Sequence, residues 1–148
     1  MRTIKNILVA VDLMEDSTFI AAYAKLFSER LQAKMTVVYA TPPLSQYFGL
    51  YLPQDTISKF HEESEQGATQ ELDKFVKQHF EGIETQQRLA NGQPQDVILG
   101  VAKEGNFDMI IMGTHSRKGV DRLMFGSVAN HVVKKADIPV LTVRPDMQ

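Results

Sequence analysis

Short apolar runs and longer amphipathic stretches alternate along the whole chain. The first apolar run, at 4–11, is an almost continuous series of β-branched and aliphatic residues, which is typical of a strand buried on both faces. Four further runs have strand length and bring the predicted total to five; they lie at 34–40, 83–90, 108–112 and 140–143. The run at 83–90 is more polar than the others, so we predict that it lies at an edge of the sheet.

Apolar residues at helical spacing fill the gaps between these runs. After a capping residue at Asp16 or Ser17, one helical face carries apolar residues spaced four, three and four apart, namely Ile20, Ala24, Phe27 and Leu31. The longest predicted helix covers 55–80, with an apolar stripe made of Ile57, Phe60, Ala68, Leu72, Phe75 and Val76. A third helix begins near Pro94 and a fourth covers 127–136. The proline-rich segment 41–53 breaks the pattern and is interpreted as a loop.

Strands that alternate with helices in this way form a parallel sheet with helices on both faces, because each crossover is right-handed. A chain of 148 residues is most simply one domain with one core. We therefore predict a single α/β domain over 1–148, built on an open five-stranded parallel sheet. Such sheets bind ligands at the carboxyl ends of the strands, where the strand order reverses. Asp12 follows the first strand and Gly113 follows the buried run of the fourth, so both face one crevice if they flank that point.

The most distinctive local pattern is a glycine-bearing loop between the fourth strand and the last helix. It reads Gly113-Thr114-His115-Ser116, then nine residues, then Gly126-Ser127. Backbone N–H groups at a helix N-terminus lack intrahelical acceptors and lie at the positive end of the helix dipole, so the pattern is typical of a phosphate site. Ser127 could donate its hydroxyl and N–H to a phosphate, and Arg117 and His115 could add further hydrogen bonds. Taken singly, Gly113 is a common turn residue and Ser127 a common N-cap, and only their combination favours phosphate.

Asp12 allows two interpretations. Its carboxylate could cap the loop that follows the first strand, or it could bond the base or ribose of a nucleotide in the crevice. We favour the second interpretation if the glycine loop binds phosphate. Other phosphate-binding classes do not fit: Gly100 and Gly105 have Walker A spacing but lack the Lys-Ser or Lys-Thr that follows, and no G-x-G-x-x-G follows the first strand. A phosphoacceptor domain would require an Asp in the third strand, and 83–90 has none.

Composition narrows the classes of function. The formal net charge is -2 and no long basic run occurs, which argues against nucleic acid as the main partner. The chain has no cysteine, so disulfides, thiolate metal sites and cysteine nucleophiles are excluded, and its histidines lack metal-ligand spacing. No apolar run approaches the roughly 20 residues of a membrane helix, and the start lacks the features of a signal peptide. We therefore expect a cytoplasmic protein without a membrane partner.

Taken together, these motifs resemble the universal stress protein family over the whole chain. The resemblance rests on 7–12 at the start, the glycine loop, and 138–145 at the end. The nucleotide signature of this family is Gly, two residues, Gly, nine residues, Gly, then Ser or Thr. Gly113, Gly126 and Ser127 match it, while Ser116 stands in place of the middle glycine.

The resemblance implies a fold of the adenine nucleotide α-hydrolase type, with strand order 3-2-1-4-5. It also implies a homodimer formed through the last strand, Val140 to Val143, whose edge would otherwise stay open. By resemblance, Asp12 approaches the adenine and ribose side of a bound nucleotide. The base pocket would be lined by Ala10, Val11, Ala40 and Met112. The ribose and phosphates would be surrounded by Gly113, His115, Ser116, Arg117, Gly126, Ser127 and Val128.

The function expected from these features is an ATP- or AMP-binding stress-response module whose nucleotide state alters partner contacts. Any Mg²⁺ would be held through the phosphates, since no metal site is predicted from the protein alone. A second hypothesis is a slow ATPase or phosphotransferase in which Asp12 helps to hold Mg²⁺ and Arg117 stabilises charge. A third is a nucleotide-free dimeric interaction protein that uses Tyr47, Phe48 and Tyr51 as its contact surface.

Overall fold

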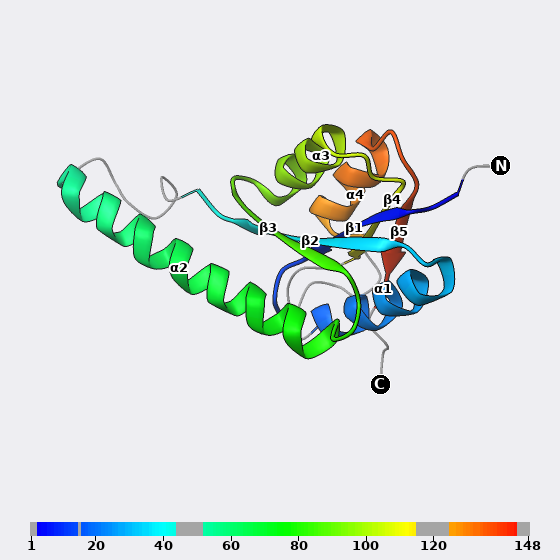
Figure 1. Ribbon diagram of the computed structural model, residues 1–148. Helices are drawn as coiled ribbons and strands as arrows, with labels where there is room; N and C mark the ends of the chain where they lie inside the picture. The colour runs from blue at the N-terminus through cyan, green and yellow to red at the C-terminus, as the bar shows by residue number, and fades with distance from the viewer. Residues whose placement is uncertain (1–2, 15, 44–51, 115–124, 145–148) are drawn as a thin grey trace.

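The structure, a computed structural model, describes residues 3–14, 16–43, 52–114 and 125–144. In chain order the elements are β1 (Asn6–Val11), α1 (Ser17–Leu31), β2 (Lys34–Thr41), α2 (Gln54–His79), β3 (Thr85–Asn91), α3 (Pro94–Glu104), β4 (Met109–Gly113), α4 (Ser127–Lys135) and β5 (Val140–Val143). The strands form one parallel sheet in the order β3-β2-β1-β4-β5 (Figure 1). This arrangement confirms the predicted fold class and strand order.

Helices cover both faces of the sheet. In Figure 1, α3 and α4 lie above the sheet, and α1 and α2 lie below it. Successive residues of β1 pack into these two layers in turn: Ile7, Val9 and Val11 join the cluster with α1 and α2. Leu8 and Ala10 join the cluster with α3 and α4. The continuous apolar run of β1 thus serves a central strand that is buried on both faces.

The predicted apolar face of α1 packs on the sheet except at its end. Ile20 and Ala24 are buried and Phe27 packs against the same cluster, whereas Leu31 is 36% exposed. Leu31 is the last residue of α1, where Gln32 adopts a left-handed φ of 53° and the chain turns toward β2, so this end of the apolar face stays partly exposed. At the other end Asp16 is the N-cap, but its side chain makes no capping hydrogen bond.

Helix α2 extends well beyond the sheet (Figure 1). Of its predicted stripe, Leu72 and Val76 are buried, while Phe60 is 45% exposed. The stripe is therefore continuous in sequence, but only its C-terminal part belongs to the core. Neither α2 nor any other helix in the described ranges combines the length and apolar character of a membrane span.

The polar third strand lies at an edge, as predicted. β3 pairs with β2 alone within the described sheet, and Gln86, Gln87 and Arg88 are exposed. Arg88 forms an ion pair of 3.1 Å with Glu104 of α3. A charged, polar strand at this position discourages further strand pairing.

A carboxylate joins the amino ends of β1 and β4, on the side of the sheet away from the carboxyl ends of these strands. Asp108 precedes β4, and its Oδ2 accepts hydrogen bonds from the backbone N–H groups of Lys5 at 2.8 Å and Asn6 at 2.9 Å. These two hydrogen bonds lower the pKa of Asp108 below its usual range because they favour the ionised carboxylate, and burial opposes them only weakly.

We expect Asp108→Asn to lower the free energy of unfolding at pH 7 by roughly 0.5–1 kcal/mol, a small value because the carboxylate lies close to solvent. The folded-state pKa lies below the unfolded one, so this contribution is present above about pH 4 and is lost as the pH falls through the folded-state pKa. Urea unfolding of the parent and the variant at several pH values measures the effect. Asp137→Asn, an exposed carboxylate before β5, is the control. A stability difference that stays constant down to about pH 3 would contradict this role for Asp108.

Candidate functional site

The strand order reverses between β1 and β4. From β1 the chain passes through α1 to β2 on one side, whereas β4 lies on the other side and is reached only through α3. Asp12 directly follows β1 and Gly113 is the last residue of β4, so the two residues lie at neighbouring carboxyl ends. The predicted juxtaposition is confirmed, at the place where open α/β sheets bind ligands.

A cavity opens at this point. Its empty volume, which includes open solvent at its mouth, is about 620 Å³. Its walls come from β1, β2 and β4 and from helices on both faces of the sheet. Asp12, Tyr39 and Thr114 supply its polar side chains among the described residues, and the remaining lining residues are apolar or glycine. The cavity is therefore an apolar slot with a few polar groups in its walls, the composition expected of a small-molecule site.

Most of the predicted site residues that the structure describes line this cavity. They are Ala10, Val11, Asp12, Ala40, Met112, Gly113, Gly126 and Val128. Ser127 is exposed beside the cavity and is not among its lining residues. His115, Ser116 and Arg117 lie outside the described residues.

Several lining residues were not predicted. Val38 of β2, Ile98 of α3 and Ala129 of α4 belong to the core cluster on the α3 and α4 face, and each also borders the cavity. In the sequence they look like ordinary core positions. Apolar periodicity predicts that a residue faces the core, but not whether it also borders a cavity at the edge of that core. The one available signal was the alternation of side chains along a strand: Val38 lies two residues before Ala40, so both lie on the same face of β2.

Asp12 does cap the turn that follows β1. Its Oδ1 accepts a hydrogen bond from the N–H of Met14 at 3.0 Å and another from the hydroxyl of Ser17 at 2.8 Å. The interpretation of Asp12 as a loop cap is therefore correct. It does not exclude the other interpretation, because in the part of the chain that the structure describes no hydrogen bond reaches Oδ2.

The start of α4 faces the same cavity. Gly126 is the N-cap, with an extended φ and ψ of -60° and 153°, and Ser127 is the first helical residue, so Ser127 is not itself the N-cap. The first backbone bond of the helix runs from the Asn130 N–H to the Gly126 carbonyl at 2.9 Å. The N–H groups of the three intervening residues have no acceptor within the helix and lie at the positive end of its dipole.

Thr114 ties this helix start to the sheet. Its carbonyl accepts a hydrogen bond from the Gly126 N–H at 2.8 Å, and its own N–H donates to the Val143 carbonyl at 3.0 Å. Thr114 is buried and borders the cavity. The two ends of the glycine loop are thus held together against β5, whatever the path of the residues between them.

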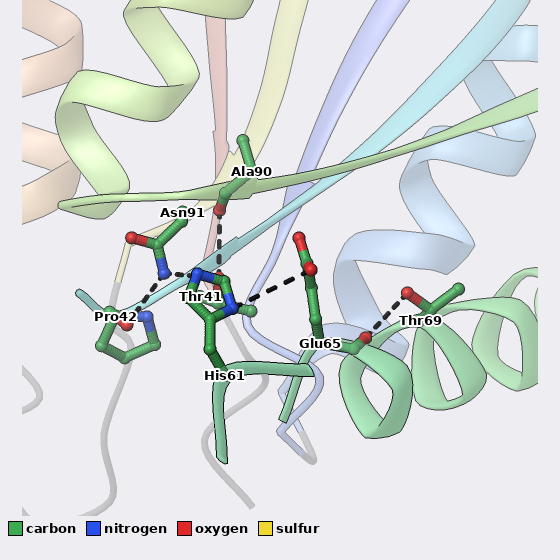
Figure 2. A network of polar contacts seen from close by, with 7 residues as sticks. All are labelled: Thr41, Pro42, His61, Glu65, Thr69, Ala90 and Asn91. Atoms are coloured by element: carbon green, nitrogen blue, oxygen red, sulfur yellow. Dashed lines mark hydrogen bonds and ion pairs between the residues drawn. The ribbon is translucent and has the colours of Figure 1, made fainter. Parts of the chain in front are cut away.

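A polar network fixes the end of β2, which forms the opposite wall. Figure 2 shows Asn91 of β3 joined to Thr41 and Pro42. The Asn91 Nδ2 donates to the Thr41 Oγ1 and to the Pro42 carbonyl, each at 3.2 Å, and the Thr41 hydroxyl donates to the Ala90 carbonyl at 3.4 Å. These bonds hold the carboxyl end of β2 beside β3 and keep Ala40 at the cavity wall.

Comparison with known proteins agrees with this geometry. The sequence profile of the universal stress protein family matches residues 3–144, nearly the whole chain. The chain belongs to the universal stress protein family. A putative universal stress protein of Staphylococcus aureus is 32% identical, with 99% of this chain and 87% of that protein covered. A universal stress protein of Thermus aquaticus is 30% identical, with 95% and 98% covered.

Solved universal stress proteins share the fold. A structure from Lactobacillus plantarum is 23% identical with a TM-score of 0.81, covering 97% of this chain and 100% of that one. A universal stress protein in complex with cAMP is 16% identical with a TM-score of 0.73, covering 98% and 100%. One from Archaeoglobus fulgidus in complex with dAMP is 24% identical with a TM-score of 0.57, covering 95% and 98%.

Proposed function

We propose that this universal stress protein binds an adenine nucleotide in the cavity between β1 and β4 and acts as a nucleotide-dependent stress-response module. The observation that carries the proposal is the meeting of an apolar slot and the N-terminal turn of α4 in a single cavity. Apolar walls suit a purine ring, and unpaired N–H groups at the positive end of a helix suit a phosphate. The family members solved with cAMP and dAMP support the same class of ligand.

In the proposed arrangement the purine packs against the apolar walls, the ribose lies near Asp12, and the phosphates lie near Gly113 and the start of α4. The purine would contact Ala10, Val11, Ala40 and Met112. The phosphate side would comprise Gly126, Ser127 and Val128, with His115, Ser116 and Arg117 contributed by the loop between them. AMP and ATP share the groups that this arrangement recognises, and Mg²⁺ would bind through the phosphates of ATP.

Calorimetric titration with AMP, and with ATP and Mg²⁺, tests the proposal directly. We expect Ala40→Phe to raise the Kd for both nucleotides by at least about tenfold, because the phenyl ring would extend from the half-buried cavity wall into the space proposed for the purine. Ala90→Phe is the matched control: Ala90 is the register partner of Ala40 on β3, packs against the same core cluster, and does not line the cavity. Absence of binding by the parent at about 1 mM nucleotide would contradict the proposal.

The phosphate end of the site has its own test in Ser127→Pro. Proline is tolerated at the first position of a helix, and the extended conformation of Gly126 suits a residue that precedes proline. The change removes one N–H and one hydroxyl from the start of α4, so we expect about a tenfold weaker affinity for AMP. Adenosine, which lacks the phosphate, should bind the parent and the variant within about twofold.

Ser127→Ala removes the hydroxyl alone and separates its contribution from that of the N–H. An equal loss of affinity for adenosine and AMP in Ser127→Pro would mean that the helix start had been distorted, and would count against a phosphate site at α4.

The β5 edge supports a second proposal, a homodimer. Within the described sheet β5 pairs with β4 alone. The Pro139 and Val143 carbonyls accept hydrogen bonds from Ile110 and Thr114 of the β4 side, at 2.9 and 3.0 Å. Backbone groups alternate in direction along a strand, so those of Val140 and Thr142 face the open edge. We propose that a second copy of the chain pairs with them.

Thr142→Pro removes an N–H from the open edge and leaves the bonds to β4 intact, since proline is accommodated on edge strands. We expect the variant to dissociate to monomers at concentrations at which the parent sediments as a dimer. Thr142→Val keeps the N–H and should remain dimeric. A monomeric parent, or a dimeric Thr142→Pro variant, would exclude pairing through this edge.

A further inference from the structure

The turn between β1 and α1 is strained next to the cavity. Leu13 has a φ of 61°, in the left-handed region that aliphatic residues rarely adopt. Its side chain packs against the core cluster beneath α1. Strain of this kind persists only where surrounding interactions outweigh it, and it is found preferentially at functional sites.

Asp12 supplies two of the hydrogen bonds that hold this turn, beside the backbone bond from the Ser17 N–H to the Met14 carbonyl at 2.9 Å. A carboxylate oxygen accepts two hydrogen bonds well, and Oδ1 already accepts two, from the Met14 N–H at 3.0 Å and the Ser17 hydroxyl at 2.8 Å. The two donors come from the turn and from the first residue of α1, so they fix both the position and the plane of the carboxylate. Oδ2 is then the oxygen left for a ligand in the cavity that Asp12 borders.

The Ser17 hydroxyl is isolated from solvent. Ser17 is 0% exposed, so bulk solvent does not reach its hydroxyl to compete with Asp12. A buried donor with one charged acceptor has a single favourable orientation, and its bond to an ionised carboxylate is among the stronger kinds in proteins. Without the Ser17 hydroxyl, the carboxylate would be held by the hydrogen bond from the Met14 N–H alone and could rotate about it.

We propose that Ser17 is a positioning residue for the nucleotide: its buried hydroxyl holds Oδ1 of Asp12 so that Oδ2 is presented to the ligand. This inference rests on the proposed nucleotide binding and extends it to a residue that does not line the cavity. The competing role for Ser17 is purely structural, namely to satisfy the β1–α1 turn and stabilise the start of α1. The two roles differ in whether loss of the Ser17 hydroxyl weakens nucleotide binding, through Asp12, in a protein that is still folded.

A double-mutant cycle separates them. The Kd for AMP is measured for the parent, Ser17→Ala, Asp12→Ala and the double variant, with the melting temperature of each. Positioning predicts that Ser17→Ala weakens binding about tenfold in the parent and less than about twofold when Asp12 is already alanine. A purely structural role predicts that Ser17→Ala lowers the melting temperature and leaves the Kd of the folded protein within about twofold of the parent; that result, or an equal loss of affinity in both backgrounds, would overturn the proposal.

Ser28→Ala is the matched control. Ser28 is also a buried serine of α1, 3% exposed, and its hydroxyl donates to the Ala33 carbonyl at 2.6 Å at the opposite end of the helix. Its loss should lower the melting temperature without changing the Kd beyond about twofold in either background.

If Ser17→Ala fails to fold, Ser17→Cys, which keeps a much weaker donor in a slightly larger side chain, replaces it in the cycle. A parent that does not bind AMP would overturn the proposed function itself. A parent that binds AMP and loses affinity on Asp12→Ala, but not on Ser17→Ala, would overturn only the inference about Ser17.

Discussion

β1 lies at the centre of the sheet, with β2 on one side and β4 on the other, and this placement fixes where the other elements can pack. Because crossovers between parallel strands are right-handed, the helices that lead outward from β1 to β3 cover one face and those that lead back to β5 cover the other. At the carboxyl ends of β1 and β4 the two chain paths diverge to opposite faces. The cavity is the space left between them.

The polar groups around this space are held by the chain itself. Buried polar side chains in the described residues are Ser17, Ser28 and Thr114. Ser17 binds Asp12 at the turn after β1, and the backbone of Thr114 joins the end of β4 to β5 and to the start of α4. A ligand would therefore meet groups whose positions are already fixed, which reduces the ordering that binding requires.

The features that support a nucleotide lie on two elements far apart in sequence, the β1–α1 turn and the start of α4. Each alone has an ordinary structural explanation: Asp12 caps its turn, and Gly126 caps its helix. Their meaning for function comes from the cavity they share with the apolar ends of β2 and β4. The same fold with this space filled by larger side chains would keep every one of these hydrogen bonds and hold no purine.

Apolar periodicity and the glycine loop are local properties that each segment carries, so the strands and helices and their order along the chain could be predicted from the residues, while the order of the strands in the sheet was implied by the family resemblance. The sequence also predicted the bounds of β5 and the polar character of β3 at the edge of the sheet. Which apolar residues form the cavity, as with Val38, Ile98 and Ala129, depends on packing in three dimensions, because an apolar position looks the same in the sequence whether a neighbour covers it or leaves a gap. The tertiary structure also decided that Leu31 stays exposed at a helix end and that Ser17 bonds a carboxylate five residues earlier. These outcomes depend on where the chain turns. The direction of each turn depends on how the helices pack against the two faces of the sheet, which no single segment specifies.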